Sequence, residues 1–198
     1  MIQRFLQDHL SADALSMLGN ISSNHLQSFR EKIRVHHNAT AYFYAPSDPC
    51  GIGGMHREMI RATPTWRNGP ARHDCVFVET DPTLPGMHGL DVVRVLAFLS
   101  FKFMGTRYPC ALVRWFCHVG DAPDEDTGMW MVEPGMDVNS FPEISIIHVD
   151  SIMRAAHLEP VYGSDFVPMV LQYHHSLDVF KSFYVNKFAD HHSFDIAF

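Results

Sequence analysis

Long apolar runs are missing from this 198-residue sequence. No stretch reaches the roughly 18 apolar residues that a membrane-spanning helix needs, so we expect no membrane association. The N-terminal residues carry Arg4, Asp8 and Asp13 among apolar ones, and this mixture leaves no hydrophobic region for a secretory signal. We therefore expect an intracellular protein, nuclear or cytoplasmic, that is not secreted.

Cysteine is scarce as well. The four cysteines form no CxxC pair and no dense framework, so we interpret them as thiols in a reducing compartment; they are Cys50, Cys75, Cys110 and Cys117. A hydrophobic fraction of 46% is enough for a chain of this length to bury a core without disulfides or metals. The composition predicts one globular domain.

Positive charge is the third scarcity, with 15 Lys and Arg against 22 Asp and Glu. The imbalance lies in residues 100–198, which hold six basic and thirteen acidic residues. A net charge of −7 repels nucleic acid and anionic membranes over most of the surface. Any nucleic-acid contact therefore needs a local basic segment.

Motifs with a defined chemistry are also absent. The glycine-rich residues 47–54 lack the lysine of a P-loop and the third glycine of a dinucleotide fingerprint, so a tight turn is the preferred interpretation. Fourteen histidines include 36–37, 174–175 and 191–192, but no set has zinc spacing. No GxSxG turn occurs. We predict no metal, no cofactor, no small-molecule ligand and no catalytic residue.

The periodicity changes along the chain from helical to alternating. Apolar residues at helical spacing predict short helices in residues 1–40, and a helical run is also expected over 55–62. Alternation predicts a hairpin whose first strand spans 93–103 and whose second begins near 108. Its inward residues should be Val95, Leu99, Val113 and Trp115. Further strands are expected at 75–79, 129–132 and 144–149, and helices at 151–156 and from Ser176 to Phe188.

These elements predict an α+β fold, in which a small antiparallel β-barrel or curled sheet is flanked by N- and C-terminal helices. An N-terminal helical lead should span 1–40, a β-rich core domain 41–160, and a C-terminal helical segment 161–198 that packs on the core. A helix that presents one apolar side is expected to bury it against such a sheet.

The concentrated positive charge lies in residues 51–73, where four arginines accompany a single acid, Glu58. Arg57 and Arg61 should share one face of the expected helix, while Arg67 and Arg72 flank Trp66, an aromatic that could stack on a base. These five residues are candidates for a weak, sequence-tolerant nucleic-acid contact. The alternative is that the arginines pair with the acidic residues 121–126 or lie in solvent.

Several phrases of the sequence resemble a known family. They include Gly-Ile-Gly-Gly-Met-His-Arg-Glu (51–58), Tyr-Pro-Cys-Ala-Leu-Val-Arg-Trp-Phe (108–116), Asp-Glu-Asp-Thr-Gly-Met-Trp (124–130) and Tyr-Val-Asn-Lys-Phe-Ala-Asp-His-His (184–192). Residues 41–198 resemble the C-terminal region of proteins encoded by Plavaka-like, CACTA-related DNA transposons of mushroom-forming fungi. The acidic triad of such transposases is expected upstream of this region, so the resemblance transfers no catalytic residue.

The resemblance implies a non-catalytic binding or assembly module of transposon origin, either a transposase accessory region or a remnant. The parent transposase or another protein is then the expected partner. The alternative is a fragment of an enzyme with a hydrolytic or metal-dependent site. Polar residues that converge in one deep pocket would favour the enzyme, whereas a shallow surface with the arginine stretch would favour binding.

Overall fold

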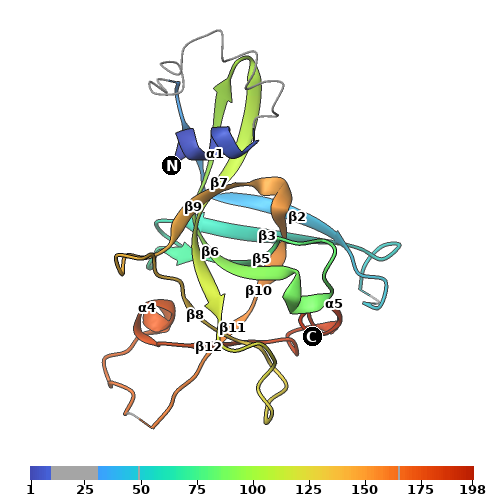
Figure 1. The fold of residues 1–198 in the computed structure, drawn as a ribbon, viewed down its shortest axis with the longest axis vertical. Helices are drawn as coiled ribbons and strands as arrows, with labels where there is room; N and C mark the ends of the chain where they lie inside the picture. The colour runs from blue at the N-terminus through green and yellow to red at the C-terminus, as the bar shows by residue number, and fades with distance from the viewer. Residues whose placement is uncertain (10–30, 49, 165) are drawn as a thin grey trace.

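The computed structural model describes residues 1–9, 31–48, 50–164 and 166–198. Within them the fold is mainly β, with short helices near the two ends of the chain (Figure 1). The predicted antiparallel barrel or curled sheet is present as a nearly closed, barrel-like sheet, whereas the expected share of helix is too large, and the fold is mainly β rather than α+β. None of the helices in the described ranges combines the length and apolar character needed to traverse a lipid bilayer.

Nine strands form the main sheet of the described residues, in the order β10-β5-β6-β7-β8-β12-β11, with β1 paired to β6 and β9 to β7. Their bounds are β1 Arg34–His36, β5 Cys75–Glu79, β6 Leu90–Phe103, β7 Thr106–His118, β8 Met131–Pro134, β9 Ile144–His148, β10 Ile152–Ala156, β11 Leu158–Pro160 and β12 Phe183–Val185. Every pair is antiparallel.

The sheet curls until its two ends meet. β11 follows β10 after His157 alone, and the His157 carbonyl accepts a hydrogen bond from the backbone N–H of Asn186 at 2.8 Å. The first and last strands of the order are thus one nearly continuous stretch of chain, which makes the sheet nearly closed and barrel-like. Large apolar side chains fill its interior, among them Phe77, Val92, Phe116, Trp130, Val132 and Phe183.

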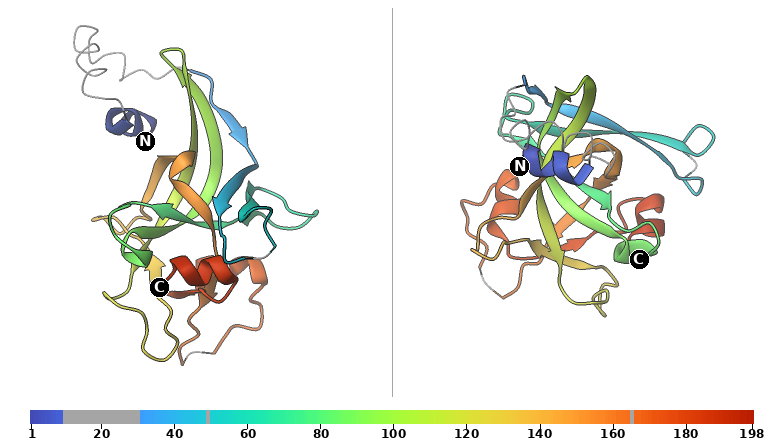
Figure 2. Two further views of the ribbon diagram at one scale, coloured as in Figure 1. Left: turned by 90° about the vertical axis from the view of Figure 1, so that its right-hand side faces the viewer. Right: turned by 45° about the horizontal axis from the view of Figure 1, so that its top comes forward.

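A second sheet of three strands lies against the barrel, in the order β2-β3-β4. Its strands are β2 Asn38–Tyr44, β3 Met55–Thr63 and β4 Arg72–His73. Ile60 and Ala62 of β3 pack against Val93, Val95 and Val113 of the β6–β7 hairpin. Figure 2 shows that the β2–β3 hairpin extends away from the barrel at its far end.

The expected helix over 55–62 is wrong, because these residues form β3. Gly53 and Gly54 adopt positive φ values of 61° and 77°, as expected for a tight turn, and they reverse the chain so that β3 pairs with β2 along its length. Backbone pairing and burial of alternate residues here outweigh a weak helical pattern. Arg57 and Arg61 still share a face, because residues four apart in a strand point the same way.

The predicted hairpin is confirmed as β6 and β7, but its inward face changes midway. Val95 and Val113 are completely buried, whereas the register shifts between Val95 and Ala97. Beyond this bulge Phe98 and Ser100 are buried and Leu99 is only partly buried, while Phe101 is buried in a separate cluster with Phe5 and Leu6 of α1. An extra residue in one strand reverses which alternate set points inward, so strict alternation from 93 to 103 fails.

Strand also replaces expected helix in the C-terminal third. Residues 151–156 form β10, which follows a 3₁₀ turn at Val149–Ser151. The expected helix from Ser176 is confined to α4, Ser176–Val179, and β12 then places Phe183 and Val185 in the barrel interior. Burial of these two side chains at a spacing of two requires a strand. A further short helix, α5 at His191–Ile196, was not expected.

The N-terminal segment is helical only in part. The described α1, Ile2–His9, places Phe5 and Leu6 against Phe101 and Cys110. Strands then begin at Arg34, inside the segment assigned to the helical lead. The other helices expected between them fall on residues 10–30, which lie outside the described residues.

A buried arginine ties α5 to the barrel. Arg154 of β10 is 3% exposed and donates two hydrogen bonds to Asp190, at 2.8 and 2.6 Å. Its guanidinium carbon lies 4.6 Å from the centre of the Phe43 ring, and Glu58 accepts the neighbouring Ala155 N–H at 3.0 Å. Asp190 also caps α5 by accepting the Ser193 N–H at 2.8 Å. A charge this deep requires such partners.

Candidate nucleic-acid interface

Trp66 lies on the connection between β3 and β4, which is itself a tight hairpin. The Trp66 N–H donates to the carbonyl of Pro70 at 3.0 Å, and the Gly69 N–H donates to the carbonyl of Trp66 at 2.9 Å. The two residues between them, Arg67 and Asn68, have positive φ values of 51° and 60°. Two consecutive left-handed residues are the signature of a type I′ turn, so Arg67 is projected from the tip of the turn.

Three guanidinium groups surround the Trp66 indole. The Cζ atoms of Arg61, Arg72 and Arg67 lie 4.4, 5.4 and 5.5 Å from the ring centre. These distances are within the range of cation–π attraction, and the indole ring is the strongest partner among the aromatic side chains. We call Arg61, Trp66, Arg67 and Arg72 the Trp66 cluster. Cation–π attraction to the indole ring offsets the mutual repulsion of the three guanidinium groups.

Asp74 is the counter-charge next to the Trp66 cluster. Its carboxylate accepts a hydrogen bond from Arg72 Nε at 2.6 Å and from the Arg61 backbone N–H at 2.8 Å. Within the described part of the chain, none of the ion pairs joins an arginine of residues 51–73 to the acidic residues 121–126. One carboxylate beside three guanidinium groups leaves the Trp66 cluster with an excess of positive charge.

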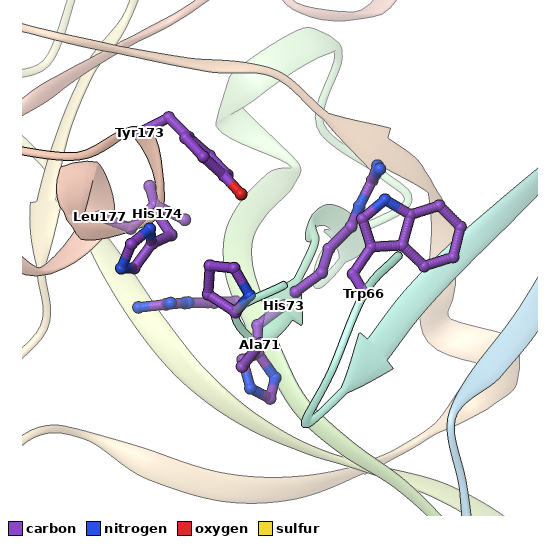
Figure 3. Close-up of a pocket in the computed structure, with 9 residues that line it drawn as sticks. Trp66, Ala71, His73, Tyr173, His174 and Leu177 are labelled. Atoms are coloured by element: carbon purple, nitrogen blue, oxygen red, sulfur yellow. The ribbon is translucent and has the colours of Figure 1, made fainter. Parts of the chain in front are cut away.

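A pocket of about 340 Å³ opens beside the Trp66 cluster. Trp66 and His73 lie on one side of it, and Tyr173 and His174, from the turn before α4, and Leu177 of α4 lie on the other (Figure 3). The Tyr173 hydroxyl points toward the space between these two sides. The remaining lining residues are Pro70, Ala71, Arg72 and Arg94. The pocket thus combines aromatic surface with nitrogen-bearing side chains.

Two arginines of the barrel add charge at this place. Arg94 lines the pocket, and Arg114 is its direct partner across the β6–β7 pair. Asp178 of α4 lies 2.6 Å from Arg94 and 4.0 Å from Arg114. Like charges placed opposite each other on two strands repel, and the Asp178 carboxylate offsets this repulsion.

Several buried donor groups around the pocket have no hydrogen-bond partner among the described residues. They are Arg61 Nε, Arg94 Nε, Arg114 Nε and the Nδ1 atom of His174. Buried polar atoms are nearly always paired in folded proteins. Five further atoms of this kind lie elsewhere in the described residues. Arg94 and His174 line the pocket itself, where an anionic ligand would offer acceptors to their nitrogen atoms.

The structure brings together four of the five residues singled out from the sequence. Arg57 lies apart from them, farther along β3, where it is exposed and opposite Tyr42. Sequence reasoning missed Arg94, Arg114, Tyr173 and His174, because these come from segments distant in the chain. Arg94 carried a signal, since it is a charged residue flanked on both sides by apolar residues within β6.

The polar cluster around Arg154 is a different kind of arrangement. Desolvation lowers the pKa of His192, and the charge of Arg154, whose Nη1 lies 3.2 Å from His192 Nδ1, lowers it further. His192 and His56 both stack on Phe43. Most of these polar groups hydrogen-bond to one another and to α5, as in structural networks, and Arg154 Nε, His56 Nε2 and Ser193 Oγ have no hydrogen-bond partner among the described residues.

No group of three histidine, cysteine, aspartate or glutamate side chains is placed to hold a metal ion within the described residues. The four cysteines are all free. Comparison of the chain with protein-family models, with curated proteins and with solved structures finds no match.

Proposed function

We propose that the protein is a non-catalytic binding module that contacts nucleic acid through the Trp66 cluster and the adjoining pocket. The observation that carries this proposal is the placement of three guanidinium groups within 5.5 Å of one indole ring. Arginine side chains bind phosphate with paired donors, and an aromatic ring beside them offers a stacking surface for a base.

The local charge supports an anionic ligand although the chain as a whole is acidic. Five arginines gather at the site, namely Arg61, Arg67, Arg72, Arg94 and Arg114, against the two carboxylates of Asp74 and Asp178. Surface potential depends on such local groups, and a confined basic patch can steer a polyanion in an otherwise repulsive field. The surrounding negative charge keeps the contact weak and local.

The backbone of the turn supports the same proposal. Arg67 adopts a positive φ of 51°, a conformation that glycine or asparagine occupies at lower cost. Strain of this kind is often retained at binding sites because it aims a side chain. Here it holds a guanidinium at the tip of the turn, beside Trp66.

The resemblance to Plavaka-like transposon proteins agrees with a DNA ligand. We propose that the module is an accessory region or remnant of such an element, and that the parent transposase is its assembly partner. In this assignment the chain contributes contacts to DNA or to the transposase, and the chemical steps belong to a catalytic core elsewhere.

The test is the binding of fluorescently labelled DNA, measured by anisotropy at low and at physiological salt. We expect the triple variant Arg61→Ala, Arg67→Ala and Arg72→Ala to abolish most of the binding. Three lost phosphate contacts should also reduce the slope of log K against log salt by about 2.7 for duplex DNA.

A matched control removes the same three charges elsewhere. Arg4, Arg34 and Arg107 are exposed and lie outside the site, so replacing all three by alanine should leave most of the affinity. The proposal is wrong if the wild-type protein binds no DNA at low salt. It is equally wrong if the control triple loses as much affinity as the site triple.

A further inference from the structure

The outer face of the β2–β3 hairpin continues the Trp66 cluster. The register pairs Asn38 with Arg61, Thr40 with Met59, Tyr42 with Arg57 and Tyr44 with Met55. Directly paired residues of an antiparallel ladder place their side chains on the same face. We call these eight residues the hairpin face. It joins the Trp66 cluster at Arg61, whose Cζ atom lies 4.4 Å from the indole centre.

The opposite side of the same hairpin is turned toward the barrel. Ala41, Ile60 and Ala62 are buried there, and Glu58 accepts the Ala155 N–H. Because side chains alternate along a strand, the hairpin face points away from the barrel. Its apolar members are correspondingly open: Tyr42 is 65% exposed, Tyr44 62%, Met55 49% and Met59 40%.

Aromatic, apolar and cationic side chains thus alternate over an exposed strip that contains no acid. Arg57 and Arg61 are its charged members, and Tyr42 lies directly opposite Arg57. An exposed apolar strip of this kind indicates a contact surface. The arginines and the absence of carboxylates within the hairpin face, in a chain of net charge −7, select a polyanion as its occupant.

We propose, on the basis of the nucleic-acid function above, that this ligand is single-stranded and that its bases stack on Tyr42 and Tyr44. Tyr42 and Tyr44 are two residues apart on one strand, so their Cα atoms are about 6.8 Å apart. This spacing is about twice the roughly 3.4 Å rise between stacked bases of one DNA strand, and a base stacks on either ring only when its own face is free. A duplex keeps the faces of its bases stacked inside and presents only phosphates, sugars and the edges of the bases in its grooves.

The path of the strand follows from the order of the residues. Bases lie on Tyr44 and Tyr42, the phosphates between them run past Arg57, and the backbone continues over Arg61 to the Trp66 cluster. Platforms that bind single strands combine aromatic rings with a basic track in this way. The hairpin face thereby supplies selection for single strands, and the Trp66 cluster supplies electrostatic attraction.

The experiment compares a labelled 20-nucleotide thymidine strand with a labelled 20-base-pair duplex by anisotropy at low salt. We expect the single strand to bind at least about tenfold more tightly than the duplex. The double variant Tyr42→Ala, Tyr44→Ala should lose about tenfold or more in affinity for the single strand and less than about twofold for the duplex.

The matched control is Tyr42→Phe, Tyr44→Phe, which keeps both rings and should bind as the wild type does. Circular dichroism checks that all variants are folded.

Equal affinity for strand and duplex, with the arginine triple still defective, overturns the single-strand inference and leaves the proposed function standing. No binding of either DNA overturns the proposed function itself. A change of oligomeric state on size exclusion in the alanine variant, without loss of DNA affinity, assigns the hairpin face to self-association and overturns the inference.

Discussion

The carboxylate of Asp178 lies 2.6 Å from the guanidinium of Arg94, on the wall of the pocket beside Trp66. It also lies 4.0 Å from Arg114, the direct cross-strand neighbour of Arg94. Asp178 is 53% exposed, so solvent screens the pair and its contribution to the free energy of unfolding is small. Its larger role is to neutralise charge at the pocket.

We predict that Asp178→Asn raises the affinity for DNA while lowering stability by less than about 1 kcal/mol. The gain should be up to about fivefold at low salt and should shrink as salt rises. Anisotropy titrations and urea denaturation measure the two effects. Asp121→Asn removes the same charge from an exposed position away from the pocket. If Asp121→Asn strengthens binding equally, Asp178 acts only through net charge.

The completely buried Val95 provides a test of the core. Val95→Asp buries a charge without a partner and should cost about 3 to 5 kcal/mol of the free energy of unfolding. Lys102→Glu, at an exposed position of the same strand, should change it by less than about 0.5 kcal/mol. Chemical denaturation of the two variants measures the difference, and equal stabilities would contradict the placement of Val95 in the core.

The sequence predicted a strand correctly where apolar residues recur without interruption along the whole element. The hairpin of β6 and β7, and the short strand β5, follow directly from the sequence pattern. β5 is buried on both faces, with Phe77 in the barrel interior and Val76 under the second sheet. The bulge near Leu96 could not be predicted, because it depends on how β7 and the second sheet pack on β6.

Residues predicted as helix but folded as strand share one cause. β3, β10 and β12 each contain residues that suit a helix locally, but each is paired with other strands: β3 with the adjacent β2 and β4, β10 with the distant β5, and β12 with β8 and β11. Val185 lies in the barrel interior opposite Leu158 of β11, for example. Local propensity differences of a few tenths of a kcal/mol per residue are overridden by such pairing and burial.

The candidate site was predictable only where its residues are close in the chain. Arg61, Trp66, Arg67 and Arg72 bracket one short connection, so their proximity follows from the sequence. Arg94 and Tyr173 join them because the barrel brings β6 and the segment before α4 to the same place. Sequence spacing alone carries no information about that closure.

The four cysteines should separate by reactivity. Burial raises the pKa of the Cys75 thiol to about 12 and that of Cys110 to about 12, and both side chains are buried. Cys50 and Cys117 are exposed, although partial desolvation also raises the pKa of Cys117. At pH 8 we expect a thiol reagent to modify Cys50 first, then Cys117, and the other two only after unfolding. Peptide mass spectrometry over time assigns each site, and rapid native labelling of Cys75 would contradict the barrel interior.

The ion pair between Arg154 and Asp190 should make stability depend on pH. Desolvation raises the pKa of Asp190, but the hydrogen bonds from Arg154 and Ser193 and the Arg154 charge outweigh it and hold the pKa well below its usual range. A carboxyl whose pKa is lower in the folded state stabilises the protein above its unfolded pKa, about 3.9. That contribution is lost as the pH falls through the folded value.

We therefore predict that Asp190→Asn lowers the free energy of unfolding at pH 7 by about 2 kcal/mol, a value below that of a fully buried pair because Asp190 is one-third exposed. Asparagine still caps α5, so the loss reports the charge of Asp190 and not the helix cap. Denaturation at pH 7, 5 and 3 should show the deficit unchanged between the first two values and smaller at the third. The control Asp121→Asn should show little deficit at any of them. The deficit shrinks at pH 3 because the unfolded wild type begins to bind a proton at Asp190 while the folded state does not. A deficit for Asp190→Asn that stays constant down to pH 3 would mean that folding does not lower the pKa of Asp190, and would contradict the ion pair.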